Sequence, residues 1–181
     1  MEKFFRLTVF VAGLIAVVML VQNITVTKMT KLREAQMLGS PDIVSIKTRE
    51  RQLECLAMNI YREAGHESFE GKVAVAQVTM NRASHPSFPK DVCGVIYQKS
   101  VFVDKVVCQF SWYCDTAHKA RPVNPAAYNE SMAVAKKVLL EGFRLDVMKE
   151  ALYYHANYVN PRWNLEKIGS IGNHIFYKGK N

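Results

Sequence analysis

The feature that most constrains this chain is a long apolar run near its N-terminus, from Leu7 to Val21. The Leu, Ile, Val and Phe side chains in the run together favour insertion into a bilayer by roughly 3 to 6 kcal/mol. A full membrane span needs about 20 residues, so the helix must continue past the polar Gln22 and Asn23 to Val26. We therefore predict one membrane-spanning helix over residues 7–26, within an N-terminal segment 1–27.

The sequence around this run bears on where the rest of the chain lies. No small-residue cleavage motif follows it, which favours an uncleaved signal anchor over a protein secreted after signal cleavage. Lysine and arginine flank both ends in similar numbers, so the positive-inside rule does not set the orientation. The cysteines and the expected function place the remainder outside the cytoplasm. We expect a single-pass protein of the cell inner membrane, with its folded domain in the periplasm.

The chain has four cysteines, at positions 55, 93, 108 and 114. An even number behind an export signal is typical of disulfides formed in an oxidising compartment. Three pairings are possible, and the short spacing of Cys108 and Cys114 favours joining them, which leaves Cys55 with Cys93. Free core thiols and a zinc site are the alternatives, although the sequence has no Cys-x-x-Cys motif.

Beyond the apolar run, the sequence predicts a mixed-charge stalk over residues 28–48, with a turn at Gly39-Ser40-Pro41-Asp42, and a folded domain over residues 49–181. Apolar periodicity predicts a helix over 50–64 and a nearly all-apolar, buried helix from Ser68 to Arg82. Shorter helices are expected over 91–97 and from Asn124-Pro125 to Glu141. Residues 107–114 read as irregular or extended, and 151–156 and 173–178 as strands able to pair. The predicted class is α+β, mainly helical, with a small β element.

The formal net charge of +8 suggests a polyanionic partner such as a cell-wall polymer or acidic lipid. Because lysine and arginine are scattered, a nucleic-acid-binding arm is not expected. Metal-site patterns are incomplete: His66-Glu67 lacks the second histidine of the zinc-protease motif, and His155 and His174 would only face each other across a hairpin. A thiol peptidase using Cys114 and His155 requires a free thiol. We expect no metal and no cofactor.

Glu63 is the strongest candidate for catalysis. It ends an amphipathic helix just before Gly65 and faces an apolar second helix, where partial desolvation would raise its pKa. A glycosidase acid requires such a shift. Glu67, Asp104 and Asp115 are candidates for a second carboxylate, and none has a spacing that singles it out.

Aromatic and amide side chains alternate in three segments, 108–113, 153–155 and 160–163. Sugar rings stack on aromatic faces while amides and hydroxyls bind their hydroxyl groups. These segments are therefore candidates for a glycan-binding cleft.

Several stretches resemble the SleB/CwlJ family of cell-wall hydrolases. They are Ile60–Glu67 with its continuation to Asn81-Arg82, Phe88-Pro89, Cys93–Tyr97, Cys108–Ser111, His155–Val159 with Pro161–Trp163, and Ile171–Tyr177. The resemblance covers residues 51–178 and implies a lysozyme-like, lytic-transglycosylase-like fold acting on peptidoglycan or spore cortex. It matches Glu63 to the catalytic glutamate. Polar and aromatic residues of these motifs, together with Tyr154 of the aromatic segment 153–155, are candidates for substrate binding: Glu67, Gln77, Asn81, Tyr97, Gln109, Ser111, Tyr154, His155, Trp163 and His174.

The chain departs from the family motif at one place. The family usually reads Glu-Ala-Arg-Gly-Glu, whereas here Gly65-His66 stands in the middle. We expect a monomer that cuts glycan strands between N-acetylmuramic acid and N-acetylglucosamine, giving 1,6-anhydro products as a lytic transglycosylase does. A lysozyme-type hydrolase with a second carboxylate and a non-catalytic wall-binding protein on the same fold are the alternatives. A bacterial envelope enzyme and an endolysin-like phage lysis protein fit the sequence equally.

Overall fold

The structure is a computed structural model that describes residues 2–38 and 41–179, and the chain divides into two units, Met1–Thr48 and Arg49–Asn181. The first unit holds helix α1, Glu2–Leu38. Among its described residues, the 20-residue stretch Gly13–Leu32 is long and apolar enough to cross a membrane, and none of it is buried. It overlaps the predicted span 7–26 and ends later. Such a helix near an N-terminus is typical of both a membrane anchor and a signal sequence.

Helix α2 runs from Pro41 to Ala64 and so begins well before residue 50, where the sequence predicted its start. Residues 28–38 and 41–48 of the expected stalk are therefore helical, and Gly39 and Ser40 of the expected turn lie outside the described residues. The prediction followed the apolar stripe that starts at Leu53. The preceding part of α2 is exposed from Ser45 to Arg51 and packs no apolar stripe, while proline suits the first turn of a helix.

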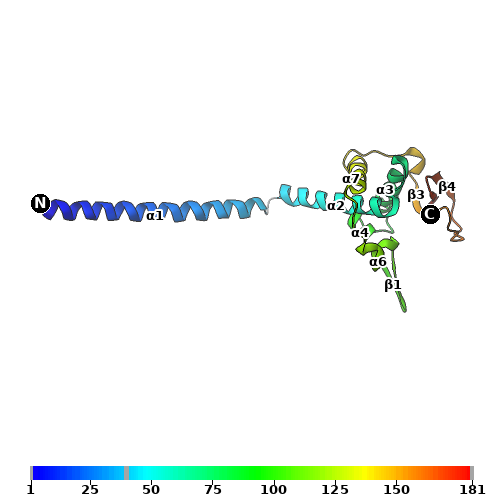
Figure 1. Cartoon of the computed structure of the whole chain (residues 1–181), viewed down its shortest axis with the longest axis horizontal. Helices are drawn as coiled ribbons and strands as arrows, with labels where there is room; N and C mark the ends of the chain where they lie inside the picture. Colours follow the sequence, from blue (N-terminus) through cyan, green and yellow to red (C-terminus); the bar gives the residue numbers. More distant parts are fainter. Residues whose placement is uncertain (1, 39–40, 180–181) are drawn as a thin grey trace. The chain divides into compact units, whose positions relative to one another are not determined.

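Helix α3, Phe69–Ser84, is the centre of the second unit, between α7 and strand β3 (Figure 1). Ser68 caps its N-terminus by accepting a hydrogen bond from the Gly71 backbone N–H at 3.3 Å, as predicted. Residues Val73–Ala76 and Val78 are fully buried, which confirms the prediction of a helix covered on most sides. One face of α3 packs in a cluster with α2, α4 and α7, and the other packs against the sheet.

The remaining helices are short, apart from α7, and some of them begin at capping side chains, of which only Asn124 was predicted as a cap. Asp91 caps α4 through the Gly94 N–H, and Asn124 caps α7 through the Ala127 N–H. The helix α7 ends slightly before the predicted Glu141. The bounds are α4 Val92–Ile96, α5 Ser111–Cys114, α6 Thr116–Ala120, α7 Pro125–Leu139, and the 3-10 turn η1 Asp146–Met148.

Two small antiparallel sheets complete the second unit. Strands β3 (Ala151–Ala156), β4 (Lys167–Ile171) and β5 (His174–Lys178) form a sheet in the order β3-β5-β4, which confirms the predicted pairing of 151–156 with 173–178. Strands β1 (Lys99–Phe102) and β2 (Lys105–Cys108) form a hairpin that extends away from the helices (Figure 1). The class is thus α+β and mostly helical, as predicted. Neither β4 nor β1 was predicted, because β4 contains Gly169-Ser170 and β1 buries no face.

The cysteines form two disulfides, Cys55–Cys93 and Cys108–Cys114, which are the pairs that the spacing favoured. The first joins α2 to α4 inside the hydrophobic core. The second joins the end of β2 to the end of α5, so it closes the loop that carries Gln109 and Ser111.

Candidate active site

A cavity of about 650 Å³ lies in the second unit between the end of α2, strand β3 and the β2–α5 loop. Its size is that of a site for a small ligand or a few sugar rings. Seven of the eleven candidate site residues line it: Glu63, Gln109, Ser111, Tyr154, His155, Trp163 and His174.

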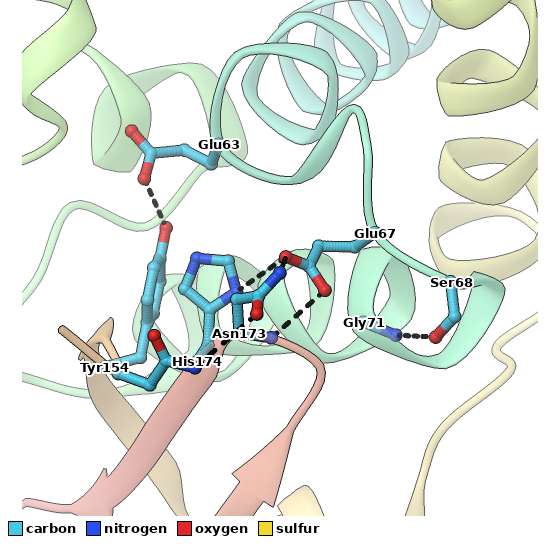
Figure 2. A network of polar contacts seen from close by, with 8 residues as sticks. Glu63, Glu67, Ser68, Gly71, Tyr154, Asn173 and His174 are labelled. Atoms are coloured by element: carbon cyan, nitrogen blue, oxygen red, sulfur yellow. Dashed lines mark hydrogen bonds and ion pairs between the residues drawn. The ribbon is translucent and has the colours of Figure 1, made fainter.

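Glu63 occupies the last turn of α2, and its carboxylate points toward strand β3 (Figure 2). The Tyr154 hydroxyl donates a hydrogen bond to Glu63 Oε2 at 2.9 Å. Helix α2 ends at Ala64, and a Cβ at position 65 would lie 2.5 Å from the Tyr61 carbonyl oxygen, so glycine fits the turn that follows. The sequence break that singled out Glu63 is therefore present in the structure, and Glu63 lines the cavity.

Burial raises the pKa of Glu63, and this effect exceeds the opposing influences of the Tyr154 hydrogen bond and the Arg82 charge. A raised pKa keeps a larger fraction of the carboxyl protonated near neutral pH, which is what a general acid requires. Desolvation also raises the pKa of Tyr154 well above its usual value, with the Glu63 charge as the second cause. The phenol therefore stays a hydrogen-bond donor.

Arg82 forms the floor of the cavity and was not among the predicted site residues. It is 4% exposed, and its Nε donates to the Leu152 carbonyl at 2.7 Å. With its amide oxygen turned toward Arg82, Gln109 accepts from both terminal guanidinium nitrogens, at 3.1 and 3.3 Å. The guanidinium also lies over the rings of Phe88, Phe110 and Tyr153. Two sequence signals point to Arg82: it ends an apolar helix, and it belongs to the family-like stretch that ends at Asn81-Arg82.

Aromatic side chains make the opposite wall. The carbonyl of Ala156 can only accept, so its 2.9 Å contact with His155 Nδ1 places a proton on that nitrogen. Nε2 of the same ring lies within hydrogen-bond distance of the Tyr177 hydroxyl, at 2.9 Å. The ring of Trp163 packs edge-on against His155 and remains 41% exposed. A partly exposed indole held by its neighbours is suited to stacking on a sugar ring.

Glu67 does not line the cavity and instead binds a turn next to it. Its carboxylate accepts from the Asn173 backbone N–H at 3.2 Å and from Asn173 Nδ2 at 3.0 Å, so it holds the β4–β5 turn (Figure 2). His174 Nδ1 lies 3.9 Å from Glu67 Oε1. Burial nevertheless lowers the pKa of His174, which leaves its ring neutral at pH 7 as it packs edge-on against Tyr154.

Four predicted residues lie outside the cavity: Glu67, Gln77, Asn81 and Tyr97. Gln77 exchanges two hydrogen bonds with the Leu145 backbone, at 2.8 and 3.1 Å. Asn81 donates to the carbonyls of Met148 and Ala151, at 2.9 Å each, and so fixes the start of β3 on α3. Tyr97 packs against Trp112 and Tyr113. The sequence shows only that these side chains are polar or aromatic. The fold is needed to tell a side chain that holds the backbone in place from one that lines the cavity.

Among the described residues that line the cavity, Glu63 is the only carboxylic acid. Asp115, another candidate, is exposed and caps α6 by accepting from the His118 N–H at 3.0 Å. That backbone bond is the main reason why its pKa is lowered. Asp104 lies in the turn of the β1–β2 hairpin. Within the described part of the chain, no three His, Cys, Asp or Glu side chains gather as a metal site would require.

Comparison with known proteins defines the class of this domain. A family model described as cell wall hydrolase matches residues 66–177, which is more than half of the chain. The chain therefore belongs to the cell wall hydrolase family, and the resemblance to SleB and CwlJ is confirmed. The matched region begins at His66, so Glu63 lies just before it.

Comparison with individual proteins gives more specific relatives than the family model does. The spore cortex-lytic enzyme of Bacillus subtilis (strain 168) is 31% identical over 132 residues, which are 68% of this chain and 36% of that protein. The enzyme of the same name from Halalkalibacterium halodurans is 40% identical over 134 residues, 70% of this chain and 34% of that protein. The chain thus spans about a third of the length of these two relatives.

Two solved structures share the fold. The catalytic domain of the Bacillus cereus SleB protein is 27% identical, with a TM-score of 0.53 over 71% of this chain and 91% of that one. The catalytic domain of the germination-specific lytic transglycosylase SleB from Bacillus anthracis is 28% identical, with a TM-score of 0.51 over 70% and 93%. The matched part of this chain therefore corresponds to nearly the whole of those catalytic domains.

Proposed function

We propose that this protein cleaves the glycan strands of peptidoglycan between N-acetylmuramic acid and N-acetylglucosamine, with Glu63 as the general acid. The observation that carries the proposal is a single carboxyl group, desolvated and bound by Tyr154, in a cavity walled by aromatic and amide side chains. Membership of the cell wall hydrolase family supports the same substrate class.

The contacts of Glu63 assign a role to each carboxyl oxygen. Because the Tyr154 hydroxyl donates to Oε2, the proton of neutral Glu63 is carried on Oε1. Oε1 would transfer this proton to the glycosidic oxygen as its bond to the anomeric carbon of the muramic acid breaks. The positive charge that develops on the sugar is then opposite the newly formed carboxylate, and Arg82 with Tyr154 stabilises that carboxylate.

The second half of the reaction needs a nucleophile. Hydrolases usually place a second carboxylate beside the bond, and among the described lining residues Glu63 has no such companion. We infer that the Glu63 carboxylate takes the proton from the C6 hydroxyl of the same muramic acid. The C6 oxygen then bonds to the anomeric carbon, which gives a 1,6-anhydro sugar and returns the proton to Glu63. The name of the B. anthracis relative, a lytic transglycosylase, supports this course.

The mass of the released fragments tests the chemistry. Digestion of purified peptidoglycan should release muropeptides that are one water lighter than those made by a lysozyme and that end in anhydro-muramic acid. Fragments that end only in reducing N-acetylmuramic acid would show hydrolysis instead. In that case a second carboxylate, Glu67 or Asp115, would have to leave its present hydrogen bonds and orient a water.

We also propose that residues 7–26 hold the protein in the inner membrane, with the second unit outside the cytoplasm. The apolar stretch of α1 and the two disulfides support this location, because disulfides persist in oxidising compartments. Secretion after signal cleavage is the alternative. It would place the same enzyme in the same compartment without its tether.

A further inference from the structure

A second cavity, of about 610 Å³, adjoins the catalytic one, because Arg62 and His118 line both. It is formed by the end of α2, the turn after it, the segment from α6 to Asn124, and the first turns of α7. Gly65 and His66, where the chain departs from the family motif, are both in its wall. Since Arg62 is next to the proposed acid Glu63, a ligand held at the catalytic site could extend into this second cavity.

Two arginines and two histidines lie among the eleven residues that line the second cavity. They are Arg62, Arg121, His66 and His118. Glu130 is the only carboxylate among its described lining residues, and it binds Lys72 Nζ at 2.9 Å. Asp115 acts electrostatically on His118 and Arg121 from outside the lining, while its carboxylate caps α6.

Arg62 is held in the wall of this cavity by backbone carbonyls and not by a carboxylate of the described residues. Its terminal nitrogens donate to the backbone carbonyls of His118 at 3.0 Å, Arg121 at 3.1 Å and Lys119 at 3.4 Å. Its Nε is buried without a hydrogen-bond partner among the described residues. In the described part of the chain, Arg62 forms no ion pair with a carboxylate. A guanidinium held by neutral carbonyls keeps its full charge for a ligand.

We propose that this second cavity binds the carboxylates of the peptide stem attached to the muramic acid whose bond is cut. The inference rests on the proposed function, because it needs that sugar beside Glu63. The stem leaves the sugar through the lactyl group on C3, which is two bonds from the anomeric carbon C1 of the same ring, the carbon that Glu63 addresses. A short acidic peptide therefore begins at the boundary between the cavities, and the volume of the second one suits a few residues of it.

The test compares two soluble, uncrosslinked glycan preparations that differ only in charge. One keeps its stem carboxylates, and in the other they have been converted to amides with carbodiimide and ammonia. The full chain, purified in mild detergent, should show the higher kcat/KM on the charged strands. Arg121→Glu should lower the ratio of the two kcat/KM values by about 2- to 5-fold, because Arg121 is exposed and exposed charge pairs contribute little. Arg121→Lys should keep most of the ratio.

Lys167→Glu is the matched control. It makes the same charge change on edge strand β4 and lines neither cavity, so the ratio should not move. Equal kcat/KM on both preparations, or an unchanged ratio in Arg121→Glu, would overturn the inference while leaving the proposed function intact.

A binding measurement distinguishes failure of the proposed function from failure of the stem-binding inference. If the wild-type chain cleaves neither preparation, the proposed function is wrong, and fluorescence anisotropy with labelled strands then decides the inference alone. Tighter binding of charged than of amidated strands, abolished in a folded Arg121→Glu chain, would support a stem site. Equal binding of both would reject it. Glu63→Gln should lose cleavage of both preparations and still prefer the charged one.

Discussion

At the scale of single residues, the neighbours of the Glu63 carboxyl group set its acidity. Burial raises the pKa of Glu63, while Tyr154 and Arg82 act in the opposite direction. The sequence could locate Glu63, because a helix end followed by glycine is a local pattern. It did not single out Arg82, whose cavity position depends on the Leu152 carbonyl and on Gln109, both far away in the chain.

Replacing Glu63 by glutamine should abolish most of the activity. The amide keeps the shape of the side chain and has no proton to transfer, so cleavage should fall by about 10² to 10⁴-fold. Glu70→Gln removes an exposed carboxylate at the start of α3 and serves as the control. Release of muropeptides from purified peptidoglycan measures the effect. Near-normal release by a folded Glu63→Gln protein would remove Glu63 from the mechanism.

Tyr154→Phe should alter the pH profile as well as the rate. Its hydrogen bond lowers the pKa of Glu63, so its loss lets burial raise that pKa further. Because the protonated acid is the active form, the alkaline limb of kcat/KM should move to higher pH. The rate itself should fall by roughly fivefold with the loss of one positioning hydrogen bond of about 1 kcal/mol. Tyr128→Phe, outside the catalytic cavity, should leave the profile in place. A limb that stays put or moves to lower pH would contradict the assignment.

At the scale of elements, the sequence predicted what local patterns determine. The predicted caps at Ser68 and Asn124 mark the starts of α3 and α7, and segments rich in tyrosine, isoleucine, phenylalanine and histidine mark β3 and β5. Elements without a local pattern were missed: β1, β4 and the first turns of α2. Gln77 and Asn81 show the same limit within the site. Their amides bind the backbone of residues 145–151, and no spacing along the chain reveals such distant partners.

The two disulfides should differ in what they contribute. Loop-closure entropy predicts that Cys55–Cys93, with a separation of 38 residues, stabilises the fold by about 4 kcal/mol, and that Cys108–Cys114, with a separation of 6, contributes about 2 kcal/mol. Replacing the first pair by serine should therefore cause the larger loss in urea unfolding. Replacing the second should cause the larger loss of kcat/KM, because it frees the loop that carries Gln109 and Ser111. Equal effects of both pairs on activity would show that this loop keeps its shape unaided.

At the scale of the whole molecule, an apolar helical segment is joined to a basic folded unit. The net charge of +8 suits an anionic polymer or an anionic lipid surface, and a tether would hold the enzyme near both. A tethered wall enzyme acts only on the strands within reach of its anchor.

The location can be checked by fractionation and by a fusion. The full-length protein should pellet with membranes, and alkaline phosphatase joined to its C-terminus should be active, since that enzyme needs an oxidising compartment to form its disulfides. A variant with two leucines in the apolar stretch changed to lysine, Leu14→Lys with Leu20→Lys, should no longer pellet with membranes. A soluble product shortened by about 25 residues would show signal cleavage instead.

The conformation and surroundings of Gly172 restrict which mutations the site can tolerate during evolution. Its backbone has φ +56°, and a Cβ there would overlap the Glu67 carboxylate that holds the β4–β5 turn. Every amino acid that a single nucleotide change can substitute for glycine carries a Cβ. Each such mutation would therefore displace Glu67 and, with it, the turn that sets His174 beside Tyr154. Among descendants selected for wall cleavage, position 172 should stay invariant although it does not line the catalytic cavity.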